Sequence, residues 1–167
     1  MIIKGKVWKF GNDISTDHIA PGRYFHLRTN LPELAKHVLE DARDDFPQKV
    51  EKGDLITAGR NFGLGSSREH APRIMKLAGI SCVVAKNFAR IFYRNSINVG
   101  LPLVELKEAD EINEGDILEI NLENGILKDI TRNKEYRFKP LPEFILKIIE
   151  MGGIENYIKK YGDYFKE

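Results

Sequence analysis

The residues best suited to chemistry lie in one short stretch, residues 59–70, which contains three glycines, two adjacent serines and an arginine. Ser66 and Ser67 offer two hydroxyls, and Arg68 adds a rigid fork of donors that suits a carboxylate or a phosphate. An apolar run precedes the stretch and a helical period follows it, which predicts a turn from a strand into a helix. Glycines allow positive φ and close ligand approach, and a helix start favours anions. The stretch therefore predicts an anion-binding catalytic turn.

The same residues allow a second interpretation. Ser66 and Glu69 have the spacing of a capping box, which would give both residues a role in starting the helix and none in catalysis. Two other glycine motifs are excluded, because Arg68 stands where a dinucleotide fingerprint needs a third glycine and no Gly-Lys-Ser/Thr follows as in a P-loop. The residues alone leave catalysis and capping both open.

Two further loops carry polar residues. Residues 11–19 contain Thr16, Asp17 and His18, without the compact spacing of metal ligands, so we expect no metal site there and expect local hydrogen bonds to fold the loop. Residues 20–30 place Arg28 among aromatic residues. This loop is compatible either with contact to an anionic ligand or with a solvated surface.

Three separated motifs resemble one family. Residues 63–71 (Gly-Leu-Gly-Ser-Ser-Arg-Glu-His-Ala) closely resemble the turn in the swivelling domain of the aconitase superfamily, and residues 16–19 (Thr-Asp-His-Ile) resemble a segment near the start of that domain. Residues 86–91 resemble the family's Lys-x-Phe-Ala-Arg-Ile run. The length and the order of the motifs are similar to the small subunits of the isopropylmalate dehydratase and homoaconitase family, over nearly the whole chain.

The resemblance implies a hydro-lyase small subunit that helps to isomerise 2-isopropylmalate to 3-isopropylmalate by dehydration and rehydration, in leucine biosynthesis. It implies that Ser66 is the base that removes a carbon-bound proton. It also implies that Arg68 holds a substrate carboxylate and that Ser67 hydrogen-bonds the substrate or the turn. Thr16 and Asp17 would line the active site.

The substrate stays open between two hydroxy acids. Residues 27–29 (Leu-Arg-Thr) resemble the homoaconitase form of this loop, in which an arginine pairs with a third substrate carboxylate. Isopropylmalate enzymes usually place apolar residues here, and Phe25 and His26 depart from the family pattern. Arg28 is therefore the candidate residue for reading the variable end of the substrate.

The resemblance also implies a partner. In the family a [4Fe–4S] cluster with one open iron acts as a Lewis acid, and such a cluster needs cysteine ligands. This chain has one cysteine, Cys82, in an apolar run that indicates a buried strand. We therefore expect no cofactor in this chain, and a large iron–sulfur subunit that completes the active site in a heterodimer or heterotetramer.

Two alternatives of other classes are a non-catalytic anion-binding or regulatory module and a serine hydrolase. The intact serine–serine–arginine trio argues against the first. The second would use Ser66 with His18 or His70, but the chain lacks the Gly-x-Ser-x-Gly elbow.

Composition sets the broad class. The 167 residues are 42% hydrophobic with a formal net charge of +1, which suits one globular domain over residues 1–167 and gives no field that would attract nucleic acid or a membrane surface. Residues 1–4 lead directly into a strand pattern, so we expect no secretory signal and a cytoplasmic protein.

Alternating strands and helices followed by a hairpin region predict an α/β domain with mixed sheets and flanking helices. The resemblance implies the swivelling β/β/α domain of the aconitase superfamily. We expect strands at residues 2–10, 54–58, 80–85, 103–106, 117–122, 126–130 and 135–138, and helices at residues 31–40, 71–78, within 86–96, and at 144–151 and 154–161.

Overall fold

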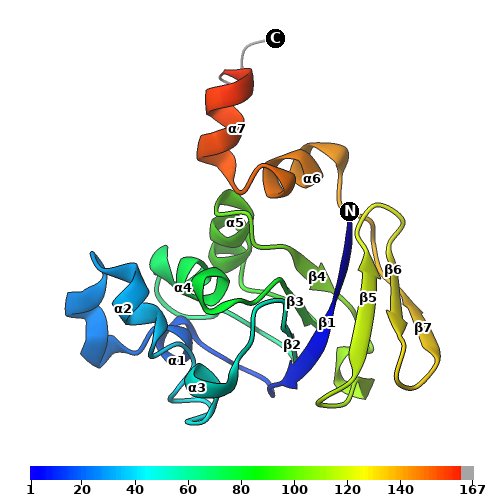
Figure 1. The fold of residues 1–167 in the computed structure, drawn as a ribbon, viewed down its shortest axis with the longest axis horizontal. Coiled ribbons are helices and arrows are strands. Elements are labelled where there is room, and N and C mark those ends of the chain that lie inside the picture. Colours follow the sequence, from blue (N-terminus) through cyan, green and yellow to red (C-terminus); the bar gives the residue numbers. More distant parts are fainter. Residues whose placement is uncertain (163–167) are drawn as a thin grey trace.

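A computed structural model describes residues 1–162, and its centre is a mixed sheet with the strand order β4-β3-β2-β1-β5-β6-β7 (Figure 1). β1 pairs in parallel with β2 and antiparallel with β5, so it joins a parallel half to an antiparallel half. The predicted α/β class with a mixed sheet is confirmed. The strands are β1 (Ile2–Lys9), β2 (Leu55–Ala58), β3 (Cys82–Ala85), β4 (Leu103–Glu105), β5 (Ile117–Asn121), β6 (Ile126–Asp129) and β7 (Lys134–Arg137).

The parallel half is covered on both faces, as its continuous apolar strands predict. Every residue of β2 and β3 is buried. Alternate residues of β3 enter two different cores, with Val83 in one and Cys82 and Val84 in the other. Burial raises the pKa of the Cys82 thiol, so this side chain stays protonated and acts as a small core residue.

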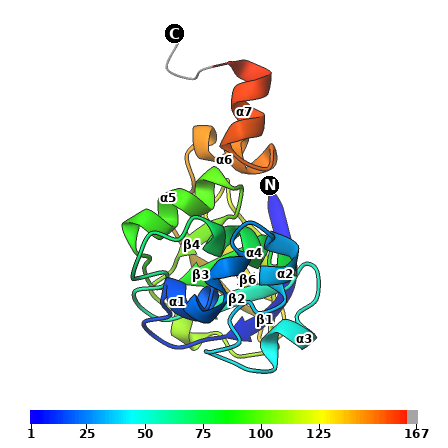
Figure 2. The same ribbon diagram turned by 90° about the vertical axis from the view of Figure 1, so that its left-hand side faces the viewer.

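Helices surround the sheet unevenly. One group lies beside the parallel half, and α7 projects beyond the body of the molecule at the other end (Figures 1 and 2). No helix in residues 1–162 is long and apolar enough to cross a membrane. The α-helices are α1 (Thr16–Ile19), α2 (Leu31–Ala35), α3 (Phe46–Lys49), α4 (His70–Ala78), α5 (Arg90–Asn98), α6 (Glu143–Glu150) and α7 (Ile154–Tyr161), and the 3-10 helices are η1 (Gly22–Leu27) and η2 (Ala109–Glu111).

The helix predicted at residues 31–40 is half as long as its apolar stripe suggested. α2 ends at Ala35, and Leu39 takes a positive φ of 56°. The backbone N–H of Leu39 donates instead to the carbonyl of Ile19 at 3.0 Å. Leu34, Val38 and Leu39 are nevertheless buried, so the apolar pattern identified the core residues while a tertiary hydrogen bond ended the helix.

The antiparallel half contains a buried pair of carboxyl groups. Asp116 precedes β5 and Asp129 ends β6, and they are 4% and 1% exposed. Asp129 Oδ1 accepts from the N–H of Arg132 at 3.2 Å, whereas Asp129 Oδ2 has no hydrogen-bond partner within residues 1–162. Burial and the neighbouring Asp116 carboxyl raise the pKa of Asp129 to about 6. A proton on Asp129 therefore replaces repulsion between the two groups with a hydrogen bond.

We expect Asp129→Asn to change how stability depends on pH. Because the native state holds this proton more tightly than the unfolded chain, the free energy of unfolding should fall as pH rises from about 4 through about 6. The variant should lose that fall and exceed the unmodified chain by roughly 1–3 kcal/mol above about pH 7. Urea unfolding at several pH values measures this, with Asp44→Asn, an exposed carboxyl, as control. If the free energy of unfolding depended on pH in the same way in all three proteins, Asp129 would not hold a proton in the native state as described.

Candidate active site

The turn that carries Ser66 connects β2 to α4, as predicted, and α4 begins one residue before the predicted range of 71–78. Its first residue is His70, and Glu69 at the N-cap position makes no side-chain capping bond. The capping box, which was the second interpretation of Ser66 and Glu69, is therefore not formed. Arg68 lies in the turn, two residues before the helix begins. Ser66 and Ser67 are exposed and Arg68 is half-buried.

A second loop holds the turn in place. The backbone N–H of Gly63 donates to Ile14 at 2.7 Å, and that of Thr16 donates to Leu64 at 2.8 Å. The Thr16 hydroxyl, in a residue only 3% exposed, donates to the carbonyl of Ser66 at 2.8 Å. This bond occupies the Ser66 carbonyl and fixes the backbone beside its hydroxyl. Thr16 thus lies at the site, as the sequence predicted.

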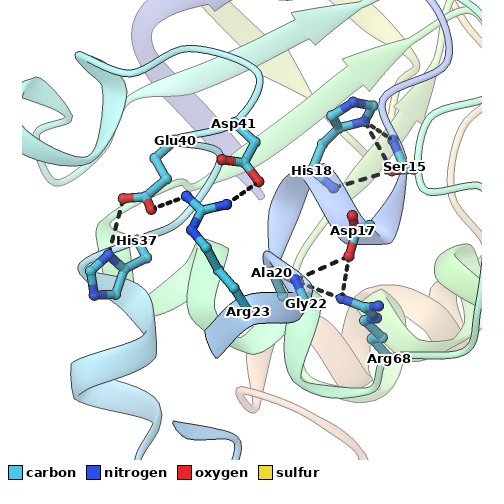
Figure 3. Close-up of polar contacts among 10 residues, drawn as sticks. All are labelled: Ser15, Asp17, His18, Ala20, Gly22, Arg23, His37, Glu40, Asp41 and Arg68. Carbon is cyan, nitrogen blue, oxygen red and sulfur yellow. Dashed lines mark hydrogen bonds and ion pairs between the residues drawn. The ribbon is translucent and has the colours of Figure 1, made fainter. Parts of the chain in front are cut away.

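The loop that contains Thr16 folds through its own side chains. Ser15 Oγ accepts from the backbone N–H of His18 at 3.1 Å, and His18 Nδ1 accepts from the backbone N–H of Ser15 at 2.9 Å. This reciprocal pair caps the one-turn helix α1, where a loop was expected. Figure 3 shows the His18 ring turned toward Ser15 and away from Arg68. His18 therefore has a structural role here.

Two glycines let the turn pack closely against α5 and against the loop that contains Thr16. Gly63 has a φ of 85°, and a Cβ there would lie 2.1 Å from the ring of Phe92. Gly65 has a φ of 105°, and its Cβ would lie 3.2 Å from Thr16 Oγ1. At Gly63 the close approach and the positive φ both oppose a larger residue, and at Gly65 the positive φ makes a larger residue strained.

Arg68 is held from one side by the α1–η1 segment (Figure 3). Its Nη1 lies 2.6 Å from the carbonyl of Ala20 and 2.9 Å from Asp17 Oδ1. The same Asp17 oxygen accepts from the N–H of Gly22 at 3.0 Å. Nη2 and Nε of Arg68 have no partner among residues 1–162, so the guanidinium is oriented by one nitrogen and keeps donors for a ligand. Asp17 positions Arg68 through this contact.

The backbone of the turn adds donors to those of Arg68. The N–H groups of Gly65, Ser66 and Ser67 donate to no group in the described part of the chain. Consecutive N–H groups around a glycine with positive φ form a concave site suited to an anion. Together with Arg68 they make the surroundings of the Ser66 hydroxyl electropositive.

These groups border a cavity of about 210 Å³ between the turn and α5. The structure thus brings together Thr16, Ser66, Ser67 and Arg68 as predicted. The opposite wall of the cavity was not predicted from the sequence. The signal that could have found it was the recurrence of residues at helical spacing in α5. That wall consists of Ala89, Arg90, Ile91, Phe92 and Asn95.

Arg28 does not line this cavity. Its Nη1 donates to the carbonyl of Phe25 at 3.1 Å, and its guanidinium lies 4.3 Å from the centre of the Phe25 ring. The Phe25 ring in turn meets His70 edge-on, with centroids 6.3 Å apart. Burial, then the charges of Arg68 and Arg28, lower the pKa of His70, so its ring stays neutral to lower pH than a free histidine. Arg28 and Arg68 therefore both lie close enough to His70 to disfavour its charged form.

The helix η1 is also held by ion pairs and ring stacking with residues 37–41 (Figure 3). Arg23 forms ion pairs with Glu40 at 2.6 Å and with Asp41 at 2.7 Å, and this contact lowers the pKa of the Asp41 carboxyl. The Tyr24 ring stacks on His37 with centroids 3.8 Å apart. Because these charges are partly exposed, they orient η1 more than they stabilise the fold.

The chain does not match the donor set of an iron–sulfur cluster. Residues 1–162 contain no group of three or more His, Cys, Asp or Glu side chains placed to hold a metal ion. The one cysteine, Cys82, is buried in β3 away from the Ser66 cavity lining. Cluster ligation requires several thiolates, so these residues do not hold one.

A family model described as the aconitase C-terminal domain matches residues 13–109, which include the turn, both flanking strands and α5. A 3-isopropylmalate dehydratase small subunit 1 from Thermotoga maritima is 71% identical over 165 residues, covering 99% of each chain. An isopropylmalate/citramalate isomerase small subunit from Methanocaldococcus jannaschii is 57% identical over 160 residues, covering 95% of each.

The fold is also similar to a solved structure. The crystal structure of a 3-isopropylmalate dehydratase from Methanocaldococcus jannaschii superposes with a TM-score of 0.90 at 47% sequence identity. The match covers 96% of this chain and 95% of that one. The similarity therefore extends over the antiparallel half and the last helices as well as the turn.

We expect Gly63→Ala to lower the free energy of unfolding by roughly 2–4 kcal/mol, because its Cβ would overlap the Phe92 ring and its φ is positive. Gly11→Ala is the matched control, since a Cβ there meets nothing within 4 Å. Urea unfolding of the two variants beside the unmodified chain measures the difference. Equal midpoints for the two variants would show that the turn and α5 are not packed as described.

Proposed function

Because the chain belongs to the family of 3-isopropylmalate dehydratase small subunits within the aconitase superfamily, we propose that it serves as the small subunit of a hydro-lyase that interconverts 2-isopropylmalate and 3-isopropylmalate. The observation that carries the proposal is the meeting of Ser66 and Arg68 in one cavity, beside a turn whose amides have no other partner. An anionic hydroxy acid needs these donors. The reaction belongs to leucine biosynthesis.

Ser66 is the proposed base. As an alkoxide, its Oγ takes a proton from the carbon next to a carboxylate, and the electrons of that C–H bond form a double bond while the adjacent C–O bond breaks and hydroxide leaves with its electron pair. A cluster held by the large subunit would supply the Lewis acid that accepts this hydroxide. Water then adds back across the double bond, so that the hydroxyl ends on the carbon that lost the proton and the hydrogen on the carbon that lost the hydroxyl. Serine is a weak acid, so its alkoxide needs fixed positive potential. Arg68 and the free amides of residues 65–67 support this assignment.

The remaining residues bind and orient the substrate. Arg68 clamps a carboxylate with the nitrogens that Asp17 and Ala20 leave free. Ser67 hydrogen-bonds the substrate or the turn. Thr16 holds the backbone of Ser66, so its contribution is to place the base at the proton.

We place the [4Fe–4S] cluster in a large-subunit partner, because the residues of this chain do not match its ligands. The Ser66 cavity is open in the isolated small subunit, with exposed Ser66 and Ser67 at its border. A partner that covers it would exclude water from the reacting groups. We propose that this assembly works in the cytoplasm, where amino-acid precursors are made.

The variable end of the substrate is assigned to Arg28. Its contact with Phe25 creates a surface with both an aromatic face and a charge. The aromatic face suits an isopropyl group, whereas the charge suits the third carboxylate of homoaconitate. Isopropylmalate is the main proposal because the relatives above carry that name, and homoaconitate is the second candidate because of Arg28.

We expect Ser66→Ala to lower kcat by about a thousandfold or more in anaerobic assays with the reconstituted large subunit, because it removes the base. Ser67→Ala should retain more activity, and both variants should bind the large subunit like the unmodified chain. Turnover of the Ser66 variant near that of the unmodified chain would refute the assignment. A complex with an intact cluster that converts no substrate would instead favour the non-catalytic binding module.

We expect Arg28→Val to lower kcat/KM for homoaconitate by about a hundredfold, because the loss of one ion-paired charge weakens carboxylate binding. Activity on 2-isopropylmalate should be kept or raised, while Arg28→Lys should retain part of the homoaconitate activity. Parallel assays with 2-isopropylmalate, homoaconitate and citramalate measure the ratios. Unchanged ratios in Arg28→Val would remove Arg28 from the specificity site.

A further inference from the structure

A second hollow, with a volume of about 740 Å³, lies between α5, β4 and α6. Most of the residues that line it are apolar, including Tyr93 and Ile97 from α5 and Ile145 and Ile148 from α6. We call it the α5–α6 groove. In Figure 1, α5 and α6 lie at the end of the molecule from which α7 projects, away from α2 and η1. The groove is thus separate from the segment that carries Arg28.

Apolar surface continues on both sides of α5. Phe144, at the groove, is 41% exposed, and Ile91, at the Ser66 cavity, is 52% exposed. Each exposed square ångström of such surface is disfavoured in water by about 25 cal/mol. A patch that combines a groove with large exposed apolar side chains marks an interaction surface.

The rim of this groove is basic. Arg90, Arg94 and Lys139 line it and make no ion pair or side-chain hydrogen bond within residues 1–162. Glu105 is the acidic residue in its lining. The rim therefore favours a partner that brings carboxylates to unpaired cations.

The groove and the Ser66 cavity are neighbours across one helix. Arg90, the first residue of α5, lines both hollows. Phe92 and Asn95 face the cavity, while Tyr93 and Ile97 face the groove. A protein that covers the Ser66 cavity must therefore pass over the start of α5, and the groove lies directly beyond it.

We infer that the α5–α6 groove docks the large iron–sulfur subunit, which inserts an apolar segment flanked by acidic side chains. The inference rests on the proposed function, because the partner that docks here is the one that completes the Ser66 site. A second copy of this chain suits the groove less well. A symmetric contact through the groove would place two basic rims against each other.

The inference predicts weaker association when the groove is altered. Arg94→Glu and Phe144→Ala should each raise the Kd for the large subunit by about tenfold or more, measured by calorimetry with the full chain and no substrate. Their matched controls are Lys128→Glu, an exposed cation on β6, and Leu77→Ala, an exposed apolar residue on α4. Circular dichroism should confirm the fold of all four. At saturating small subunit, the groove variants should reach the kcat of the unmodified complex.

Groove variants that bind as tightly as their controls would overturn the inference. So would a self-associating unmodified chain that Phe144→Ala converts to a monomer, since the groove would then belong to a second copy. Binding is measured without substrate, so the two proposals fail separately. A complex that forms but converts none of the substrates refutes the proposed function, while groove-dependent binding would still stand.

Discussion

The site depends on the contact between two loops that the sheet brings side by side, residues 14–16 and residues 63–66. Backbone hydrogen bonds join Gly63 to Ile14 and Thr16 to Leu64, and the Thr16 hydroxyl closes the contact on the Ser66 carbonyl. These bonds are largely shielded from water, so breaking one leaves a buried polar group unsatisfied. The position of the Ser66 hydroxyl therefore follows from the packing of β1 against β2, with little freedom of its own.

The contact between the two loops also determines the charges and hydrogen-bond donors around Ser66. The segment that holds Ser66 also carries Asp17, which orients Arg68 through one nitrogen and leaves its other donors available. The Asp17 carboxylate keeps Arg68 in place and offsets part of its charge, while Nη2 and Nε of Arg68 and the amides of the turn remain as donors for an anion. The pKa of His70 is lowered by burial and by the guanidinium groups of Arg68 and Arg28, which disfavour the charged form of its ring. An anionic substrate thus meets donors that are already in position, which reduces the entropy lost on binding.

In our proposal this chain supplies one part of an active site that a large subunit completes. The Ser66 cavity has one wall from the turn and one from α5, and exposed Ile91 stands at its border. The basic and apolar groove on the other face of α5 extends the same surface. α5 thus forms a wall of the Ser66 cavity, and in our proposal the large subunit packs over this helix.

The sequence by itself determined the strands, the turn and the family. Periodicity located β1 through β7 to within one or two residues. The three separated motifs together indicated the family by resemblance, and with it a hydro-lyase, whereas the anion site at Ser66–Arg68 stays a prediction. These features are local, because a strand or a glycine turn is encoded by neighbouring residues. A single cysteine in an apolar run likewise sufficed to predict that Cys82 is a core residue.

Only the tertiary structure decided which residues meet. Thr16 and Ser66 are 50 positions apart, and Arg68 and Ala20 are 48 positions apart, so no local pattern reports their contacts. A contact of this kind also explains the error in α2, because Leu39 leaves the predicted helix and its N–H donates to the carbonyl of Ile19. Local propensities are worth less than a buried hydrogen bond, so where the two compete the fold sets the outcome.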